Sequence, residues 1–342
     1  MSTPTQDYSH PDQAVRHSYP LNAGEEGFSA ALSLCLKTMP YILLRIGILA
    51  GFTLAAIVWL ALCGGVAYLF SGKDGGGGGG MILFLIGFGI PAGLFFWLRQ
   101  YVLYLIKCGH IAVLTKLITD GALPEGVNQV EYGKKIVCDR FAQTNVLFVI
   151  DSLVTGTARA FNRTLDWVAG LIPIPGLESL MQVVNRIVDN ATTFVDETIF
   201  SYNLARGDDN MWRSSRDGLV YYAANVKPIL KTAIISLLIE YGATFVVFLV
   251  CLIPAYLLSL VLPGSVSGFA WIFAIFLAAG VRSAVLRPVF LTMVMLTFHK
   301  NAQNQPINES LSAQLESLSS KFVELKEKAA SFVSGKPAEA KI

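Results

Sequence analysis

Four charged residues lie within or at the edge of long apolar stretches, where a charge is costly and is by default a sign of function. They are Glu240, Arg99, Arg282 and Arg287. A carboxyl group surrounded by hydrocarbon tends to take up a proton, so Glu240 is a candidate proton or cation site. In the structural alternatives, Glu240 pairs with Arg282, stays neutral between helices, or lies at the interface because the span begins later. We expect the arginines to extend toward the lipid headgroups.

Few other residues are arranged for chemistry. The five cysteines and four histidines show no metal-ligand spacing, and the chain has no HExxH, Walker or dinucleotide-binding motif. We therefore predict a non-enzymatic protein with no catalytic residue, no cofactor and no metal site. Between residues 107 and 231, 13 basic residues balance 13 acidic ones, so we also predict no nucleic-acid partner.

The composition indicates a chain that spans a membrane. Hydrophobic residues make up 54% of it and charged residues only 15%, against about 25% charged in an ordinary soluble domain. A helix of about 20 apolar residues matches the hydrocarbon thickness of a bilayer. We predict an all-α, polytopic integral membrane protein whose four transmembrane helices cover about 41–70, 81–106, 229–263 and 265–299.

The basic residues predict the orientation of these helices. Of the 26 lysines and arginines, 22 lie near the N-terminus, in the middle region or in the C-terminal tail, whereas the loop after the first span has only Lys73. Positive charge gathers on the cytoplasmic side of membrane proteins. We expect a plasma or inner membrane protein with the bilayer as partner and with both termini and the middle region in the cytoplasm.

Two segments are predicted to be interfacial amphipathic helices, one in each half of the chain. The first half, 25–120, begins with such a helix and continues as two spans, and the second half, 211–300, repeats this order. In the second helix, rings and guanidinium groups at the foot of an apolar run are typical of interface anchors. The candidate anchors are Trp212, Arg213, Arg216 and Tyr222. Residues 1–24 are predicted to be a disordered tail.

The middle region, 121–210, is predicted to form a long cytoplasmic antiparallel helical hairpin. Apolar residues recur at helical spacing on both sides of the sequence GLIPIPG, whose prolines exclude a helix interior. The turn is therefore placed at 170–176. Its uncharged tip either packs on the protein or contacts lipid or a partner. The candidate contact residues are Trp167, Leu171, Ile172 and Ile174.

The polar C-terminal tail, 301–342, has leucines at helical spacing, which indicates a short coiled coil, a docking helix or a marginal helix. Because the hairpin is the best-patterned region, our first hypothesis is a scaffold or assembly partner that uses it to bind a protein or a second copy. The alternative is an oligomeric transporter or channel for an ion or small molecule, with Glu240 and Arg282 in its path.

Overall fold

The computed structural model describes residues 19–22, 26–70, 78–141, 144–165, 181–261 and 270–333, and within these ranges every regular element is a helix. The first half contains α1 (Phe28–Lys37), α2 (Met39–Phe70), α3 (Gly78–Asp120), α4 (Gln129–Phe141) and α5 (Thr144–Asn162). It is followed by α6 (Met181–Ala191), α7 (Thr193–Arg206), α8 (Met211–Ala224), α9 (Val226–Val261) and α11 (Ala270–Val281). The chain then continues through the π-helix η3 (Arg282–Leu286), α12 (Arg287–Ala302), α13 (Glu309–Leu318) and α14 (Ser320–Val333).

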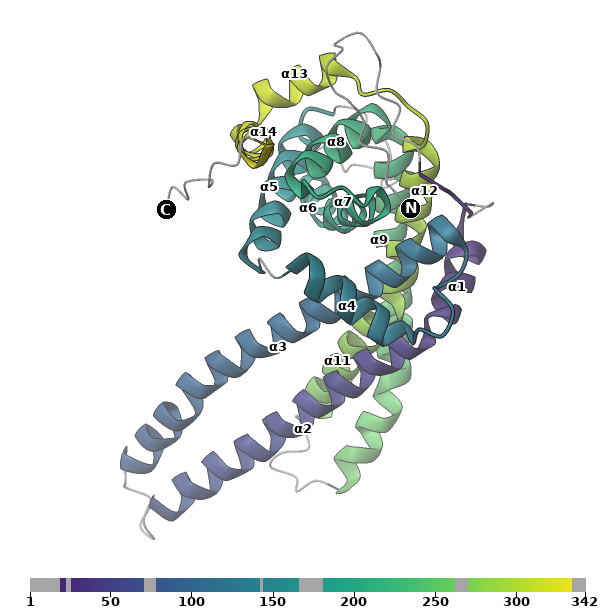
Figure 1. Ribbon diagram of the computed structural model, residues 1–342. Coiled ribbons are helices and arrows are strands. Elements are labelled where there is room, and N and C mark those ends of the chain that lie inside the picture. Colours follow the sequence, from purple (N-terminus) through teal and green to yellow (C-terminus); the bar gives the residue numbers. More distant parts are fainter. Residues whose placement is uncertain are drawn as a thin grey trace.

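Among the described residues, four helices are long and apolar enough to cross a membrane: Met39–Cys63, Ala92–Asp120, Val226–Leu257 and Trp271–Ala302. They form a first helix pair, α2 with α3, and a second helix pair, α9 with α11, which extend away from the rest of the molecule (Figure 1). Large apolar side chains on these pairs are exposed, as with Trp97 at 74% and Phe276 at 67%. An exposed apolar surface on helices of this length is typical of contact with lipid.

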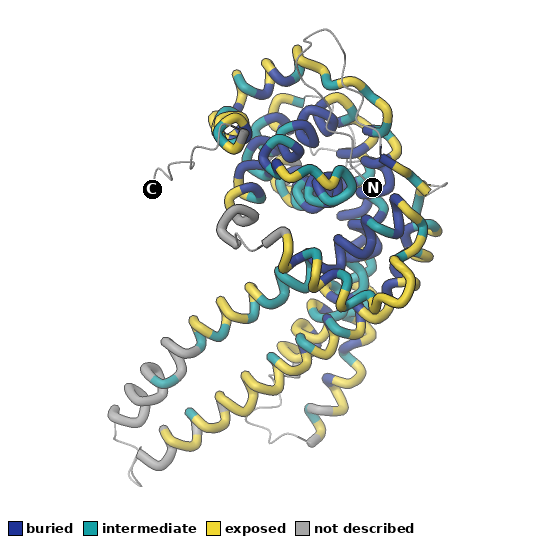
Figure 2. The backbone as a smooth tube through the Cα atoms, in the orientation of Figure 1, coloured by how far each residue is buried: buried dark blue, intermediate teal, exposed yellow. Residues whose placement is uncertain are grey.

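The remaining helices form a helical body at one end of the two pairs. Its core is built on α5, α7, α8, α12 and α14, together with the ends of α3 and α9. Figure 2 shows the buried residues gathered in this body and the exposed ones along the pairs. Tyr202 lies at the centre, where its ring makes edge contacts with those of Tyr19, Tyr221 and Phe298. The body therefore has a packed aromatic core of its own.

Two of the apolar helices continue from the exposed pairs into the body. Residues 108–119 of α3 are mostly buried, and so are 12 of the 16 residues of α12. The stretch predicted as a fourth span at 265–299 thus has two environments, which meet at η3. α11 exposes most of its side chains, whereas α12 is covered by protein.

The second part of the middle region is not one uninterrupted helix, because it is divided at Thr192 into α6 and α7. In the first part, α4 and α5 lie on either side of residues 142–143, which are outside the described residues. The Thr192 hydroxyl donates to the Val188 carbonyl at 2.7 Å and accepts from Asn162 at 3.0 Å. Hydroxyls that bond back to the preceding turn often bend a helix, which accounts for the break. The predicted turn at 170–176 lies outside the described residues.

The described C-terminal helices, α13 and α14, dock on the body. Leu315, Phe322 and Leu325 are at most 1% exposed, and α14 packs on α5 and α8. Of the three interpretations of its leucine spacing, the docking helix is the one that agrees with this burial. The segment 309–333 is therefore part of the folded body and not a free tail.

The contact of α3 with α4 gives a test of the fold. A methyl group on Gly133 would collide with the Tyr41 hydroxyl and lie 2.6 Å from the Gly109 carbonyl oxygen. We therefore expect Gly133→Ala to destabilise the protein by about 1–3 kcal/mol, the usual cost of overpacking, and to lower the apparent Tm in detergent. Gly47→Ala is the matched control, because a methyl group there meets no atom within 4 Å. An equal Tm for both variants would contradict this packing.

Candidate functional site

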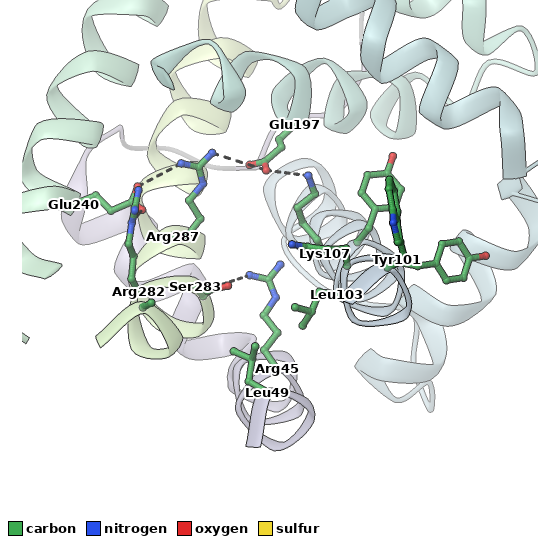
Figure 3. Close-up of a pocket in the computed structure, with 14 residues that line it drawn as sticks. Arg45, Leu49, Tyr101, Leu103, Lys107, Glu197, Glu240, Arg282, Ser283 and Arg287 are labelled. Atoms are coloured by element: carbon green, nitrogen blue, oxygen red, sulfur yellow. Dashed lines mark hydrogen bonds and ion pairs between the residues drawn. The ribbon is translucent and has the colours of Figure 1, made fainter. Parts of the chain in front are cut away.

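A cavity of about 630 Å³ lies where the two helix pairs enter the helical body. Its wall comes from α2, α3, α7, α9, α11, η3 and α12 (Figure 3). Six carboxyl, ammonium and guanidinium side chains line it: Arg45, Lys107, Glu197, Glu240, Arg282 and Arg287. Four are basic and two acidic, so with ordinary ionisation the wall carries two net positive charges. We call this group of six side chains the ionic cluster.

Glu240 is fully buried and is held between two arginines. Its Oε1 accepts from Arg282 Nε at 2.7 Å, and its Oε2 lies 3.6 Å from Arg287 Nη1. The predicted alternative in which Glu240 pairs with Arg282 is therefore the arrangement found. A buried carboxylate needs such partners, since an uncompensated charge in a protein interior costs several kcal/mol. Arg282 and Arg287 thus turn to Glu240, in place of the expected extension toward headgroups.

A second carboxylate continues the network toward the first helix pair. Glu197 on α7 accepts from Lys107 Nζ at 3.0 Å, and the same oxygen is 4.0 Å from Arg287 Nη2. Arg287 also donates to the Thr193 hydroxyl at 2.6 Å. Arg287 therefore stands between Glu240 and Glu197 and links α3 to α9 through α7 and α12 (Figure 3).

The π-helical turn η3 explains how two arginines on one helix reach the same carboxylate. In a regular α-helix, residues five apart are turned by about 140° from each other, which would separate Arg282 from Arg287. In η3 the backbone N–H of Arg287 donates to the carbonyl of Arg282. One turn then contains an extra residue, and both side chains come to the same side. Single π-turns inside α-helices are frequent at functional sites.

Pro288 follows this turn and leaves a carbonyl free for the first helix pair. The next bond of the π pattern would join the N–H of residue 288 to the carbonyl of Ser283, but proline has no N–H. Arg45 of α2 supplies a donor instead, with its Nη1 3.4 Å from the Ser283 oxygen. This contact connects α2 to η3 and brings Arg45 into the cavity (Figure 3).

Arg45 differs from the other cations of the ionic cluster. It is only 7% exposed, and its one hydrogen bond within the described part of the chain is the long contact to Ser283. Lys107, Arg282 and Arg287 each lie within 4.0 Å of a carboxylate. Arg45 has no ion pair with a described residue. It is therefore a buried cation whose charge is incompletely compensated.

The pKa values of two neighbouring carboxyl groups on α7 are shifted in opposite directions. Burial, followed by the nearby Asp151 and Glu197 carboxylates, raises the pKa of Asp196 well above its ordinary value. Burial alone would also raise the pKa of Glu197, but Lys107 and then Arg287 outweigh it and hold that pKa below its ordinary value. The ionised form is therefore disfavoured at Asp196 and favoured at Glu197, the carboxylate of the ionic cluster.

The structure separates the candidates predicted from sequence. Glu240, Arg282 and Arg287 come together, whereas Arg99 lies half-buried on α3 and is not part of the cavity wall. The contact tip, with Trp167, Leu171, Ile172 and Ile174, lies outside the described residues. Sequence reasoning did not assign Arg45, Lys107 or Glu197 to a site. One sequence feature could have identified them as site residues: all three are charged and lie close to predicted span ends or on an amphipathic helix.

The predicted interface anchors lie in the helical body. Trp212 is 9% exposed beside Lys328 of α14, and Tyr222 is 1% exposed with its hydroxyl donating to Asn162 at 2.7 Å. Arg213 and Arg216 pair locally with Asp208 and Asp217 at 2.7 and 2.6 Å. Both rings therefore pack against other helices of the body, and the interface-anchor interpretation stays a prediction.

A second polar group that the sequence did not indicate is enclosed in the body. His299 Nδ1 lies 2.7 Å from the Tyr19 hydroxyl, and its Nε2 lies 2.8 Å from the Ser201 hydroxyl. A serine next to a histidine is the beginning of a nucleophilic arrangement. Here Ser201 and His299 are fully buried, and neither lines the cavity of the ionic cluster. Their contacts fix the segment around Tyr19 to α7 and α12.

Comparison with known proteins gives no match for this chain, either to a family model, to a curated protein or to a solved structure.

Glu197 and Asp196 provide a test of the electrostatics. Glu197→Gln removes one partner of a buried ion pair, which costs about 3–5 kcal/mol, and we expect the apparent Tm at pH 7 to fall by about 5 °C or more. A depressed pKa contributes stability above the unfolded-state value of about 4.3, and this contribution disappears as the pH falls through the folded-state pKa. The acid-side loss of Tm should therefore be smaller in Glu197→Gln than in the unmodified protein.

Asp196→Asn is the matched control at the adjacent position. The raised pKa means that folding disfavours the ionised form of Asp196, so the uncharged amide should leave the Tm at pH 7 unchanged or raise it. Thermal unfolding in detergent between pH 3 and pH 8 measures both variants. Equal losses of Tm at pH 7 would contradict the opposite directions of the two pKa shifts.

Proposed function

We propose that this chain is a multi-pass membrane protein that binds an anionic ligand in the cavity of the ionic cluster. The observation that supports this most strongly is the buried guanidinium group of Arg45, which faces the cavity with no carboxylate partner among the described residues. An arginine offers a planar set of donors that fits carboxylate and phosphate groups. A ligand with such a group would supply the negative charge that no described carboxylate supplies to Arg45.

The charge balance of the wall also favours an anion. Lys107 with Glu197 and Arg282 with Glu240 form two close pairs, at 3.0 and 2.7 Å. Arg287 is shared between the two carboxylates at longer distances. The surplus positive charge therefore lies on Arg45 and Arg287, in a site partly shielded from water, where electrostatic attraction is stronger than in bulk solvent.

The expectation of a proton or cation site at Glu240 has less support. Glu240 has no exposed surface, and both of its oxygens lie within 4.0 Å of an arginine nitrogen. A cation would have to displace one of these arginines. Passage of an anion across the membrane is a second candidate function, supported by the position of the cavity between the two helix pairs. Flux of a radiolabelled anion into vesicles containing the protein tests it.

The scaffold hypothesis stays a prediction. The apolar faces of α5, α7 and α14 are used inside the body, where Val154, Val195 and Phe322 are at most 1% exposed. These apolar faces are therefore not available to bind a partner protein. The expected contact tip lies outside the described residues, so the remaining support for a partner is its apolar sequence.

Anion binding predicts a stabilisation that depends on Arg45. A ligand that binds only the folded state at 100 times its Kd adds about 2.7 kcal/mol, so inorganic phosphate should raise the apparent Tm of the purified protein. The Arg45→Gln variant should lose this rise. Lys116→Gln is the control, because Lys116 pairs with Asp120 away from the cavity. The titration uses sodium phosphate with sodium chloride added to keep the ionic strength constant.

Choline chloride serves as the cationic comparison and should give no rise. Stabilisation of the unmodified protein by choline, or equal stabilisation of Arg45→Gln and Lys116→Gln by phosphate, would refute anion binding at this cavity.

A further inference from the structure

A separate apolar groove of about 400 Å³ lies between α2 and α11. Its walls include Ile46, Ile57, Phe273, Phe276 and Gly280, and Thr53 is its one polar side chain. Thr53 donates its hydroxyl to the Leu49 carbonyl at 2.8 Å. The groove therefore offers only apolar surface and no unpaired donor, which is the chemistry that an alkyl chain requires.

The groove begins where the cavity of the ionic cluster ends. Leu49 lines both, and it lies one helical turn after Arg45 on the same face of α2. From Arg45 to Ile57 the helix rises about 18 Å, close to the thickness of one leaflet, about 15 Å. A charged site and an apolar channel thus follow one another along α2 over the depth of a single leaflet.

We propose that the cavity and the groove together bind one anionic glycerophospholipid. The phosphate lies against Arg45, with Arg282 or Arg287 as a second donor, and one acyl chain follows the groove past Leu49 between α2 and α11. This inference deepens the proposed function and depends on it, since it identifies the anion as the headgroup of a membrane lipid.

Charge and location both favour this occupant. Basic pockets between transmembrane helices are a known form of headgroup site, and the surplus of two positive charges suits a headgroup with net negative charge. Phosphatidylcholine, a zwitterionic lipid, would bring a quaternary ammonium group next to the same arginines, where like charges repel. A soluble phosphate ester would fill the cavity but leave the groove empty, so its affinity would lack the contribution of apolar burial.

The experiment compares three probes on delipidated protein in detergent. These are dioctanoyl phosphatidylglycerol, dioctanoyl phosphatidylcholine and glycerol 3-phosphate, with binding measured by native mass spectrometry and by the shift in apparent Tm. Arg45→Gln tests the headgroup end. Gly280→Leu tests the groove, where a side chain can enter because a Cβ at Gly280 meets no atom within 4 Å. Gly242→Leu is the matched control, equally open but outside both the cavity and the groove.

We expect phosphatidylglycerol to bind more tightly than either other probe. Loss of a charge-assisted hydrogen bond should weaken it roughly tenfold to a hundredfold in Arg45→Gln. Gly280→Leu should weaken phosphatidylglycerol about tenfold or more by occupying the groove, at about 0.8 kcal/mol for each methylene displaced. The Gly280→Leu variant should leave the affinity for glycerol 3-phosphate unchanged. Gly242→Leu should bind all three probes as the unmodified protein does.

Three other outcomes would overturn the lipid assignment. If glycerol 3-phosphate binds as tightly as phosphatidylglycerol and Gly280→Leu has no effect, the ligand is a free anion and the proposed function stands without the lipid. If phosphatidylcholine binds equally well, the site does not select a negative headgroup. If no probe binds, and Arg45→Gln has the Tm of the unmodified protein, both the lipid and the anion proposals fail.

Discussion

The burial of Glu240 at the point where the apolar helices meet the helical body is the constraint from which the site is built. A carboxylate with no exposed surface needs neutralising partners, and the two that serve it, Arg282 and Arg287, come from consecutive helical segments. They reach it together because η3 contains one more residue per turn than an α-helix. Pro288 ends that pattern without an N–H, and the unused carbonyl of Ser283 then accepts from Arg45. One buried charge thus accounts for the π-turn and for the link to the opposite helix pair.

These contacts also determine where the two helix pairs meet. Near the body, α2 packs on η3, and farther out its contact with α11 borders the apolar groove. α3 is held through Lys107 and Glu197 on α7. The cavity lies between these connections, so its walls come from elements that are distant in sequence but fixed to the same body. A site at such a junction would respond to any relative movement of the pairs, because the first pair contributes Arg45 and Lys107 and the second contributes Glu240.

The sequence supports part of this picture, for physical reasons that differ from residue to residue. Hydropathy finds the four apolar helices because exposed hydrocarbon must be continuous to face lipid, and Glu240 with Arg282 could be paired because few charges occur in those stretches. Hydropathy does not separate α11 from α12, since a side chain covered by lipid and one covered by protein are equally apolar. For the same reason Trp212 and Tyr222 resemble interface anchors while lying inside the body. Arg45, Lys107 and Glu197 join the site through tertiary packing, which local spacing does not contain.

The incomplete compensation of Arg45 connects stability to binding. A buried guanidinium group with one long hydrogen bond raises the free energy of the unliganded protein, because its lost hydration is not fully replaced. An anion that reaches it removes this penalty in addition to forming its own contacts, so the feature that weakens the empty protein strengthens the complex. Neither Glu240 nor Glu197 forms an ion pair with Arg45, and their ion pairs are with Arg282, Arg287 and Lys107. The two carboxylates hold the other cations in place, but two carboxylates cannot neutralise four basic side chains. The net positive charge that remains on the cavity wall distinguishes a binding cavity from a structural ion-pair network.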